Sequence, residues 1–312
     1  MLNIYKTDEN GLIKKMHKIE TNTWIDLVNP TIEEIKKVVG DTNIPENLLV
    51  KLLDTEELPR IESEEDATLI VVDVPCVEDK KNKNNYATMP LGIITNKGYL
   101  VTIALSETEV LNEIKGNKIK ALYTSKKTRF IIQLLHKVST LYVKYLNLIN
   151  QGIETREKIL IKSTSNRELI NLMNIQKSLV YFVTSLKAND ILLERLSNGS
   201  VLSLYADDVD LLEDAMIESR QGIETANIYR EILASISDTY ATVISNNLNG
   251  IMKFLAGITI VSTIPTMIAS FMGMNVPLGA ISNNDYALFI VISISVILAT
   301  AIAIILKKKD ML

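Results

Sequence analysis

Oxygen-bearing side chains recur along one stretch of the chain at a spacing that places them on a single helix face. In alternating steps of three and four residues, the row reads Asp238, Thr242, Ser245, Asn249, Met252, Ala256, Thr259, Thr263, Thr266 and Ser270. This period is typical of helices that pack around a common axis. Two interpretations stay open: the small polar residues only permit close helix packing, or they line a water-filled axis shared by several subunits.

A water-filled axis that is lined by these side chains would suit the passage of a hard cation. Mg²⁺ gives up its water reluctantly, and neutral oxygen atoms can hydrogen bond to the hydrated ion without stripping it. Asp238 and Asn249 lie toward one end of the row, and Asn275 follows the other end. Asn275 is either a turn residue or, in a ring of subunits, part of an amide collar at the mouth.

Two hydrophobic stretches must hold this row in a membrane. Residues 251–271 carry a single charge, Lys253, and residues 286–306 carry none. Each is long enough to cross a bilayer as one helix. A hairpin that opens with Gly273, Met274 and Asn275 joins them. Because two spans cannot enclose a channel, a pore would require several copies of the chain.

Charge predicts the orientation of these spans. Lys307, Lys308 and Lys309 follow the second span directly, whereas hairpin residues 276–285 contain no Lys or Arg. The positive-inside rule therefore places both termini in the cytoplasm, in a multi-pass protein of the cytoplasmic membrane. The polar first ten residues do not form a signal peptide, which agrees with a cytosolic N-terminus.

Composition excludes several functions. The formal net charge of −4 and the absence of a basic patch argue against nucleic-acid binding. The single cysteine, Cys76, fits a reducing compartment and a buried thiol. The sequence contains no P-loop, no nucleophile–base pair and no tightly spaced metal-ligand cluster, so we expect neither an enzyme nor an organic cofactor.

The elements before the tail indicate a chain of α+β class in three parts. Residues 1–125 read as a cytosolic α/β domain, because short β-like runs alternate with helical ones. Residues 126–248 read as long helices and a cytosolic stalk, with helices expected over 129–161 and 165–196 and a third from about residue 203. No proline follows until Pro265, so the third helix should run into the membrane. Residues 249–312 form the two-helix transmembrane part.

With these features in place, the chain resembles the CorA family of magnesium channels. The resemblance is carried by Gly273-Met274-Asn275 at the end of the first of two C-terminal spans, Pro265 eight residues earlier, the short hairpin, and the basic end at 306–309. It implies a funnel-shaped homopentamer in the lipid bilayer that takes up Mg²⁺ and is closed by cytosolic Mg²⁺.

The resemblance also implies roles for particular residues. Met252 and Leu255 would form a hydrophobic gate, Asp238 would be an acid in the stalk lumen, and Asp214 would bind regulatory Mg²⁺ with Glu78 or Asp79 of the α/β domain. The pore positions would be Asn249, Met252, Leu255, Thr259, Thr263, Thr266, Ser270 and Asn275, together with the motif residues Gly273 and Met274.

Two departures from the family pattern bear on function. Met272 precedes Gly273 where the family usually has Tyr, and the hairpin has one acid, Asp285, where many members have several. Fewer acids weaken the electrostatic attraction of cations to the outer mouth. Two alternatives therefore stand beside Mg²⁺ conduction: transport of Co²⁺, Ni²⁺ or Zn²⁺, and a non-conducting membrane-anchored Mg²⁺ sensor whose stripe only packs.

Overall fold

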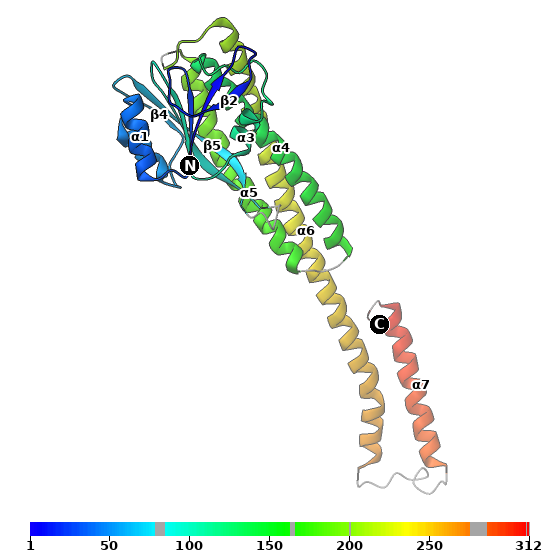
Figure 1. The fold of residues 1–312 in the computed structure, drawn as a ribbon. Coiled ribbons are helices and arrows are strands. Elements are labelled where there is room, and N and C mark those ends of the chain that lie inside the picture. Colours follow the sequence, from blue (N-terminus) through cyan, green and yellow to red (C-terminus); the bar gives the residue numbers. More distant parts are fainter. Residues whose placement is uncertain (79–84, 163–165, 200, 275–285, 310, 312) are drawn as a thin grey trace. The chain divides into compact units, whose positions relative to one another are not determined.

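The computed structural model describes residues 1–78, 85–162, 166–199, 201–274, 286–309 and 311 (Figure 1). The chain divides into an N-terminal unit, Met1–Ser235, and a C-terminal unit, Ile236–Leu312. One helix, α6, begins in the first unit and ends in the second.

A seven-stranded sheet forms the centre of the N-terminal unit, in the order β2-β1-β3-β7-β6-β5-β4. All neighbouring strands are antiparallel except β3 and β7, which pair in parallel. The strands are β1 (Leu2–Thr7), β2 (Ile13–Met16), β3 (Trp24–Val28), β4 (Arg60–Glu64), β5 (Ala67–Val77), β6 (Tyr86–Thr95) and β7 (Leu100–Ala104). The β-like runs of the sequence predict strands over 3–6, 14–20, 24–28, 68–76, 88–95 and 99–103. All strands except β4 are therefore predicted, and β2 ends at Met16 rather than at residue 20.

Helices cover both faces of this sheet because alternate strand residues are apolar on each side. Ile25 and Leu27 of β3 belong to one core together with residues of α1 (Ile32–Thr42), α2 (Glu46–Val50) and η1 (Lys51–Leu53). Trp24, which points to the opposite face, packs on Phe130 of α4, with ring centroids 5.3 Å apart. Helix α3 (Glu109–Lys115) also packs on α4.

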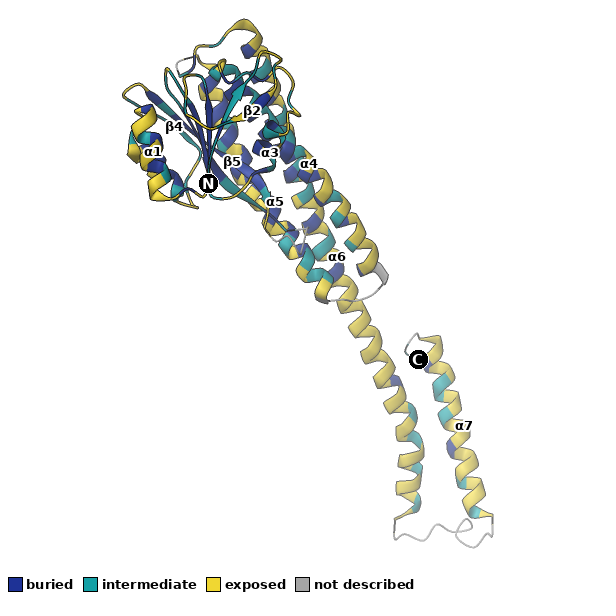
Figure 2. Cartoon of the chain, viewed as in Figure 1, coloured by how far each residue is buried: buried dark blue, intermediate teal, exposed yellow. Residues whose placement is uncertain are grey.

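Two long helices follow, α4 (Lys127–Lys162) and α5 (Asn166–Ser197). They pack on each other and on the β5–β6 hairpin, where Tyr142 and Phe182 meet edge to face at 5.0 Å. Burial is concentrated in these elements, which are mainly dark blue and teal in Figure 2. The helical periodicity of the sequence predicted both helices to within a few residues.

The remaining helices are α6 (Ala206–Met272), with Pro265 inside it, and α7 (Ala287–Lys308). Each contains an apolar stretch that is long enough to cross a membrane, and only 6% of that stretch is buried within the chain. Figure 2 accordingly shows most of α7 in yellow. An apolar surface exposed over a length of this kind is stable in lipid rather than in water.

Candidate pore-lining site

The polar row of α6 lies on an exposed helix face. Asn249, Thr259, Thr263, Thr266 and Ser270 are all exposed in the structure. Because the surrounding part of α6 is apolar enough to cross a membrane, this face is a polar line within an otherwise apolar segment. Polar groups at membrane depth usually face protein or a water-filled cavity.

Four hydroxyl groups of this row donate to the backbone of their own helix. The Oγ1 atoms of Thr259 and Thr263 lie 2.8 and 2.7 Å from carbonyl oxygens four residues earlier. Thr266 Oγ1 and Ser270 Oγ lie 3.1 and 2.8 Å from the carbonyl oxygens four residues before them. A hydroxyl has one donor and two acceptor lone pairs. With the donor used internally, each side chain offers only acceptors to its surroundings.

A second face of α6, which carries none of these hydroxyls, is covered by protein. Over residues 241–272 the residues that are buried or half-buried are Gly257, Val261, Ile264, Ile268 and Met272. On α7 the corresponding residues are Ala287, Val291, Ser295, Ala299, Ile302, Ala303 and Leu306. Each set follows one line along its helix, as expected where two helices of the C-terminal unit pack together.

These two faces of α6 point in nearly opposite directions. Thr259 precedes Val261 by two residues, and Thr266 follows Ile264 by two. Two residues correspond to about 200° around a helix axis. The hydroxyl row therefore faces away from the chain's own α7, and in a single chain nothing in the described part of this unit covers it.

The predicted gate and motif residues lie at the two ends of this row. Met252 and Leu255 are 59% and 52% exposed, so their apolar side chains are free to meet other copies. At the far end, the Gly273 amide still donates to the Ala269 carbonyl at 3.0 Å, and Met274 follows with its side chain exposed. Asn275 lies outside the described residues.

The predicted regulatory carboxylates are not brought together within one chain. Asp214 is exposed on α6, and Glu78 is exposed just after β5, where its amide donates to the Asn85 carbonyl at 2.9 Å. Asp79 lies outside the described residues. In the described ranges, no group of three or more His, Cys, Asp or Glu side chains is arranged to hold a metal ion. Asp238, toward the other end of α6, is also exposed.

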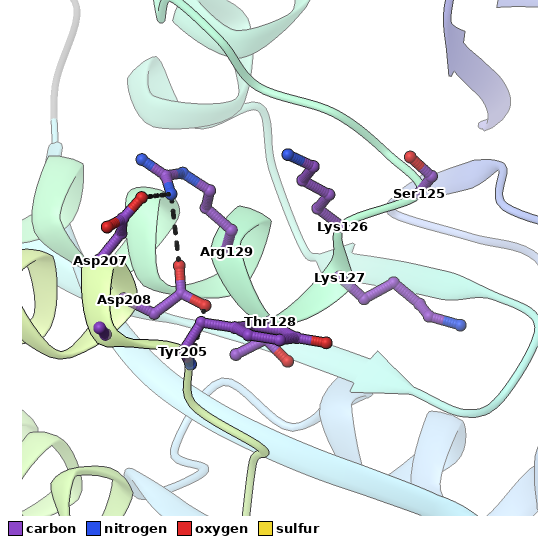
Figure 3. Close-up of a pocket in the computed structure, with 9 residues that line it drawn as sticks. Ser125, Lys126, Lys127, Thr128, Arg129, Tyr205, Asp207 and Asp208 are labelled. Atoms are coloured by element: carbon purple, nitrogen blue, oxygen red, sulfur yellow. Dashed lines mark hydrogen bonds and ion pairs between the residues drawn. The ribbon is translucent and has the colours of Figure 1, made fainter.

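A cavity of about 590 Å³ lies elsewhere in the N-terminal unit, at the starts of α4 and α6 (Figure 3). Its walls include Lys126, Lys127 and Arg129, but Arg129 Nη1 lies 3.5 Å from Asp207 Oδ2 and 3.7 Å from Asp208 Oδ1. The two carboxylates offset the guanidinium charge. None of the residues predicted for the site lines this cavity.

Sequence reasoning missed the packing partner of the hydroxyl helix. The line of Ala287, Val291, Ser295 and Ala299, with a residue every four positions, is visible in the sequence as small side chains in an apolar span. Small residues are the usual means by which membrane helices approach closely. That signal would have identified the α6-facing side of α7.

Comparison with known proteins gives this geometry a context. The family model described as CorA-like Mg²⁺ transporter protein matches residues 20–308. The chain belongs to this family. CorA membership places the protein among membrane transporters rather than enzymes, and it explains the two apolar C-terminal helices.

Individual CorA relatives cover nearly the whole chain. The cobalt/magnesium transport protein CorA of Methanocaldococcus jannaschii is 26% identical over 92% of this chain and 90% of its own. The magnesium transport protein CorA of Helicobacter pylori is 24% identical over 88% of each chain. The solved structure of the M. jannaschii CorA magnesium transporter superposes with a TM-score of 0.84 at 24% identity, over 98% of this chain and 96% of that one. The CorA fold therefore extends over both units.

Proposed function

We propose that this CorA protein is a Mg²⁺ uptake channel in which five copies surround an axis lined by the hydroxyl face of α6. The observation that carries the proposal is the position of that face, which is exposed and points away from the covering helix α7. In a ring of copies, α7 would form the outer layer and α6 the inner one. The names of the relatives, which describe magnesium transport, support the same ion.

The hydroxyl row suits a hydrated cation. The water molecules around Mg²⁺ present hydrogen atoms outward, and the row presents acceptor lone pairs, because its donors are used by carbonyls at 2.7–3.1 Å. An anion would find no free donor on these four side chains. Because the row is uncharged, it binds the ion weakly enough for the ion to leave. The amides of Asn249 and Asn275 would extend this lining at both ends.

The gate in this proposal is formed by Met252 and Leu255. Their exposed apolar side chains would form successive rings at the cytosolic end of the axis. A narrow hydrophobic constriction expels water and so blocks a hydrated ion. Asp238, further along α6, would attract cations leaving the gate.

Regulation would use the contact between neighbouring subunits. Asp214 on one copy and Glu78 or Asp79 on the next would share a cytosolic Mg²⁺ ion. Carboxylates brought together repel each other unless a divalent ion neutralises them. The exposure of Asp214 and Glu78 leaves both free for such a contact. Loss of the ion would favour separated subunits and an open gate.

The proposal assigns a location to each part of the chain. Residues 1–125 would form the cytosolic α/β domain, 126–248 the helical stalk and 249–312 the pore domain. Both termini would lie in the cytosol, with the protein in the cytoplasmic membrane, because Lys307, Lys308 and Lys309 end α7. Organic cofactors have no role in this mechanism.

Co²⁺ is a second candidate ion. The M. jannaschii relative is named a cobalt/magnesium transport protein. Uncharged oxygen acceptors interact with coordinated water rather than with the metal, so they discriminate weakly between hydrated divalent ions. The hard-oxygen lining nevertheless favours Mg²⁺ over metals that prefer nitrogen or sulfur ligands. Competition between Mg²⁺ and Co²⁺ for uptake into proteoliposomes would rank them.

The test removes acceptors from α6 without changing side-chain shape. We expect Thr259→Val, Thr263→Val and Thr266→Val together to reduce Mg²⁺ flux into proteoliposomes at least about tenfold, since each hydrogen bond lost contributes roughly 1 kcal/mol. Thr300→Val is the matched control, because Thr300 on α7 also donates to a carbonyl four residues earlier, at 2.7 Å. That variant should keep wild-type flux.

Two outcomes would reject the channel. Equal flux from the triple variant and the wild type would show that the hydroxyl face does not line the ion path. Absence of flux from the wild type, with assembly intact and Mg²⁺ still bound, would favour the sensor. Asn275→Ala is a second test of the channel. We expect this variant to assemble but to lose Mg²⁺ flux.

A further inference from the structure

Four lysines gather at one end of the C-terminal unit. Lys253 lies near the start of the membrane window of α6, and Lys307, Lys308 and Lys309 lie at the end of α7; all four side chains are exposed. From Lys253 to Gly273, and from Tyr286 to Lys307, each helix rises about 30 Å, which matches the hydrocarbon thickness of a bilayer. Both sets of lysines therefore lie at the same membrane surface.

Lys253 is not part of the hydroxyl face. It precedes Gly257 by four residues, about one helix turn, so it lies on the side of α6 that α7 covers. Lys309 follows the buried Leu306 of α7 by three residues, so it lies near the α6-facing side of that helix. Lys253 is thus about 100° or more around α6 from the proposed ion path, and the other three lysines lie on the second helix.

No described carboxylate neutralises this group. Between residues 239 and 309, the described residues include no Asp or Glu; Asp310, which follows Lys309 in the sequence, lies outside them. The preceding acid on α6 is Asp238, which lies about 22 Å along the helix from Lys253. The helix dipole favours cations at the end of α7, but it does not account for Lys253, which lies near the start of the membrane-spanning part of α6.

Apolar side chains adjoin the charges on the membrane side. Phe254 is 50% exposed beside Lys253, and Ile304 and Ile305 are 54% exposed within one turn of Lys308. A phospholipid has the matching shape, with acyl chains beside the apolar residues and a phosphate at the level of the lysines. Long lysine side chains reach this level readily.

We propose that this lysine end is a binding site for anionic phospholipid head groups, such as that of phosphatidylglycerol. It selects lipids with a net negative head group over zwitterionic ones at the membrane surface where α6 enters and α7 leaves. Each lysine should contribute about fivefold to this preference. The proposal requires membrane insertion but not ion conduction.

Spin-labelled lipids measure the preference directly. The full chain is reconstituted in phosphatidylcholine vesicles that contain a trace of spin-labelled phosphatidylglycerol or phosphatidylcholine. Electron paramagnetic resonance then gives the fraction of each label immobilised by the protein. We expect the wild type to prefer the anionic label, and Lys307→Gln, Lys308→Gln and Lys309→Gln together to reduce that preference on the order of 100-fold, leaving the roughly fivefold share of Lys253.

Matched variants separate charge from folding. The same three positions changed to Arg should keep the preference, and Lys36→Gln with Lys37→Gln, two exposed lysines of α1, should leave it unchanged. In the wild type, 1 M salt should abolish it through screening. A wild type without preference, or a triple Gln variant that prefers phosphatidylglycerol as the wild type does, would overturn the proposal. Flux measured in parallel distinguishes this failure from failure of the channel.

Discussion

At the scale of single residues, one half-buried carboxylate joins the sheet to helix α5. Asp73 of β5 accepts a hydrogen bond from Ser185 Oγ at 2.6 Å. The side chain of Asn189 pairs with both backbone groups of Asp73, at 3.0 and 2.8 Å. Because β4 pairs with β5 only as far as Val71, Asn189 takes the place of the missing strand. Burial raises the pKa of the Asp73 carboxyl above its ordinary value.

This raised pKa predicts how stability depends on pH. The neutral carboxyl favours the folded state below the ordinary pKa of 3.8, and this contribution is lost as pH rises through the higher folded-state pKa. Asp73→Asn should therefore be more stable than the wild type at pH 7, with the difference vanishing near pH 3. Urea unfolding of both proteins across this range measures it. A variant that is equally or less stable at pH 7 would contradict the assignment.

The same scale shows what sequence can reveal. Thr259, Thr263 and Thr266 were recognised because a periodic row is a local pattern. Asp73 and Asn189 were not, because they are separated by 116 residues and only the fold brings them together. The site at Asp214 is still harder to predict from the sequence, since its predicted partner belongs to another copy of the chain.

At the scale of elements, the helices with a strong hydrophobic periodicity were predicted accurately, whereas a strand with a weak pattern was not. The four long helices α4, α5, α6 and α7 begin and end within a few residues of the predicted positions. Strand β4 was missed because its sequence, RIESE, is mostly charged. It lies at the edge of the sheet, where charged side chains face water and discourage pairing with another sheet.

The packing of α6 and α7 makes a prediction at this scale. Ser295 is 8% exposed on the covered face of α7, whereas Ser293 is exposed on the same helix. Ser295→Phe should destabilise the C-terminal unit by about 1–3 kcal/mol, because a large side chain must displace α6. Ser293→Phe should leave stability unchanged. Thermal unfolding in detergent compares them, and equal melting temperatures would show that these faces do not meet.

At the scale of the whole molecule, the family match and the fold agree over nearly the entire chain. The CorA model covers residues 20–308, and the M. jannaschii structure aligns over 98% of the chain. From the residues alone, the polar row of α6 left open whether it only packs helices or lines an axis shared by several copies, and it did not give the number of copies. That number depends on the angles between neighbouring copies, and a pattern within one helix does not determine them.

The proposed regulation would be a property of the assembled molecule, and it provides a prediction at this scale. Asp214→Asn should raise the internal Mg²⁺ concentration that half-inhibits flux by at least about tenfold, comparable with loss of a residue that supports a metal ligand. Glu213→Gln is the control, since Glu213 is exposed on the same helix but points about 100° away. Flux at a series of internal Mg²⁺ concentrations measures both. An unchanged inhibition curve for Asp214→Asn would remove this residue from the sensor.

Pro265 inside α6 has a spectroscopic consequence. Proline has no amide hydrogen, so the Val261 carbonyl, one turn earlier, loses the donor that a helix would otherwise supply. In an apolar layer such a carbonyl is satisfied by water, by a neighbouring side chain or by a local change in helix geometry. With ¹³C placed at the Val261 carbonyl, the infrared amide I band should absorb at a higher frequency than the same label at Val291, and should shift in heavy water only if water reaches it.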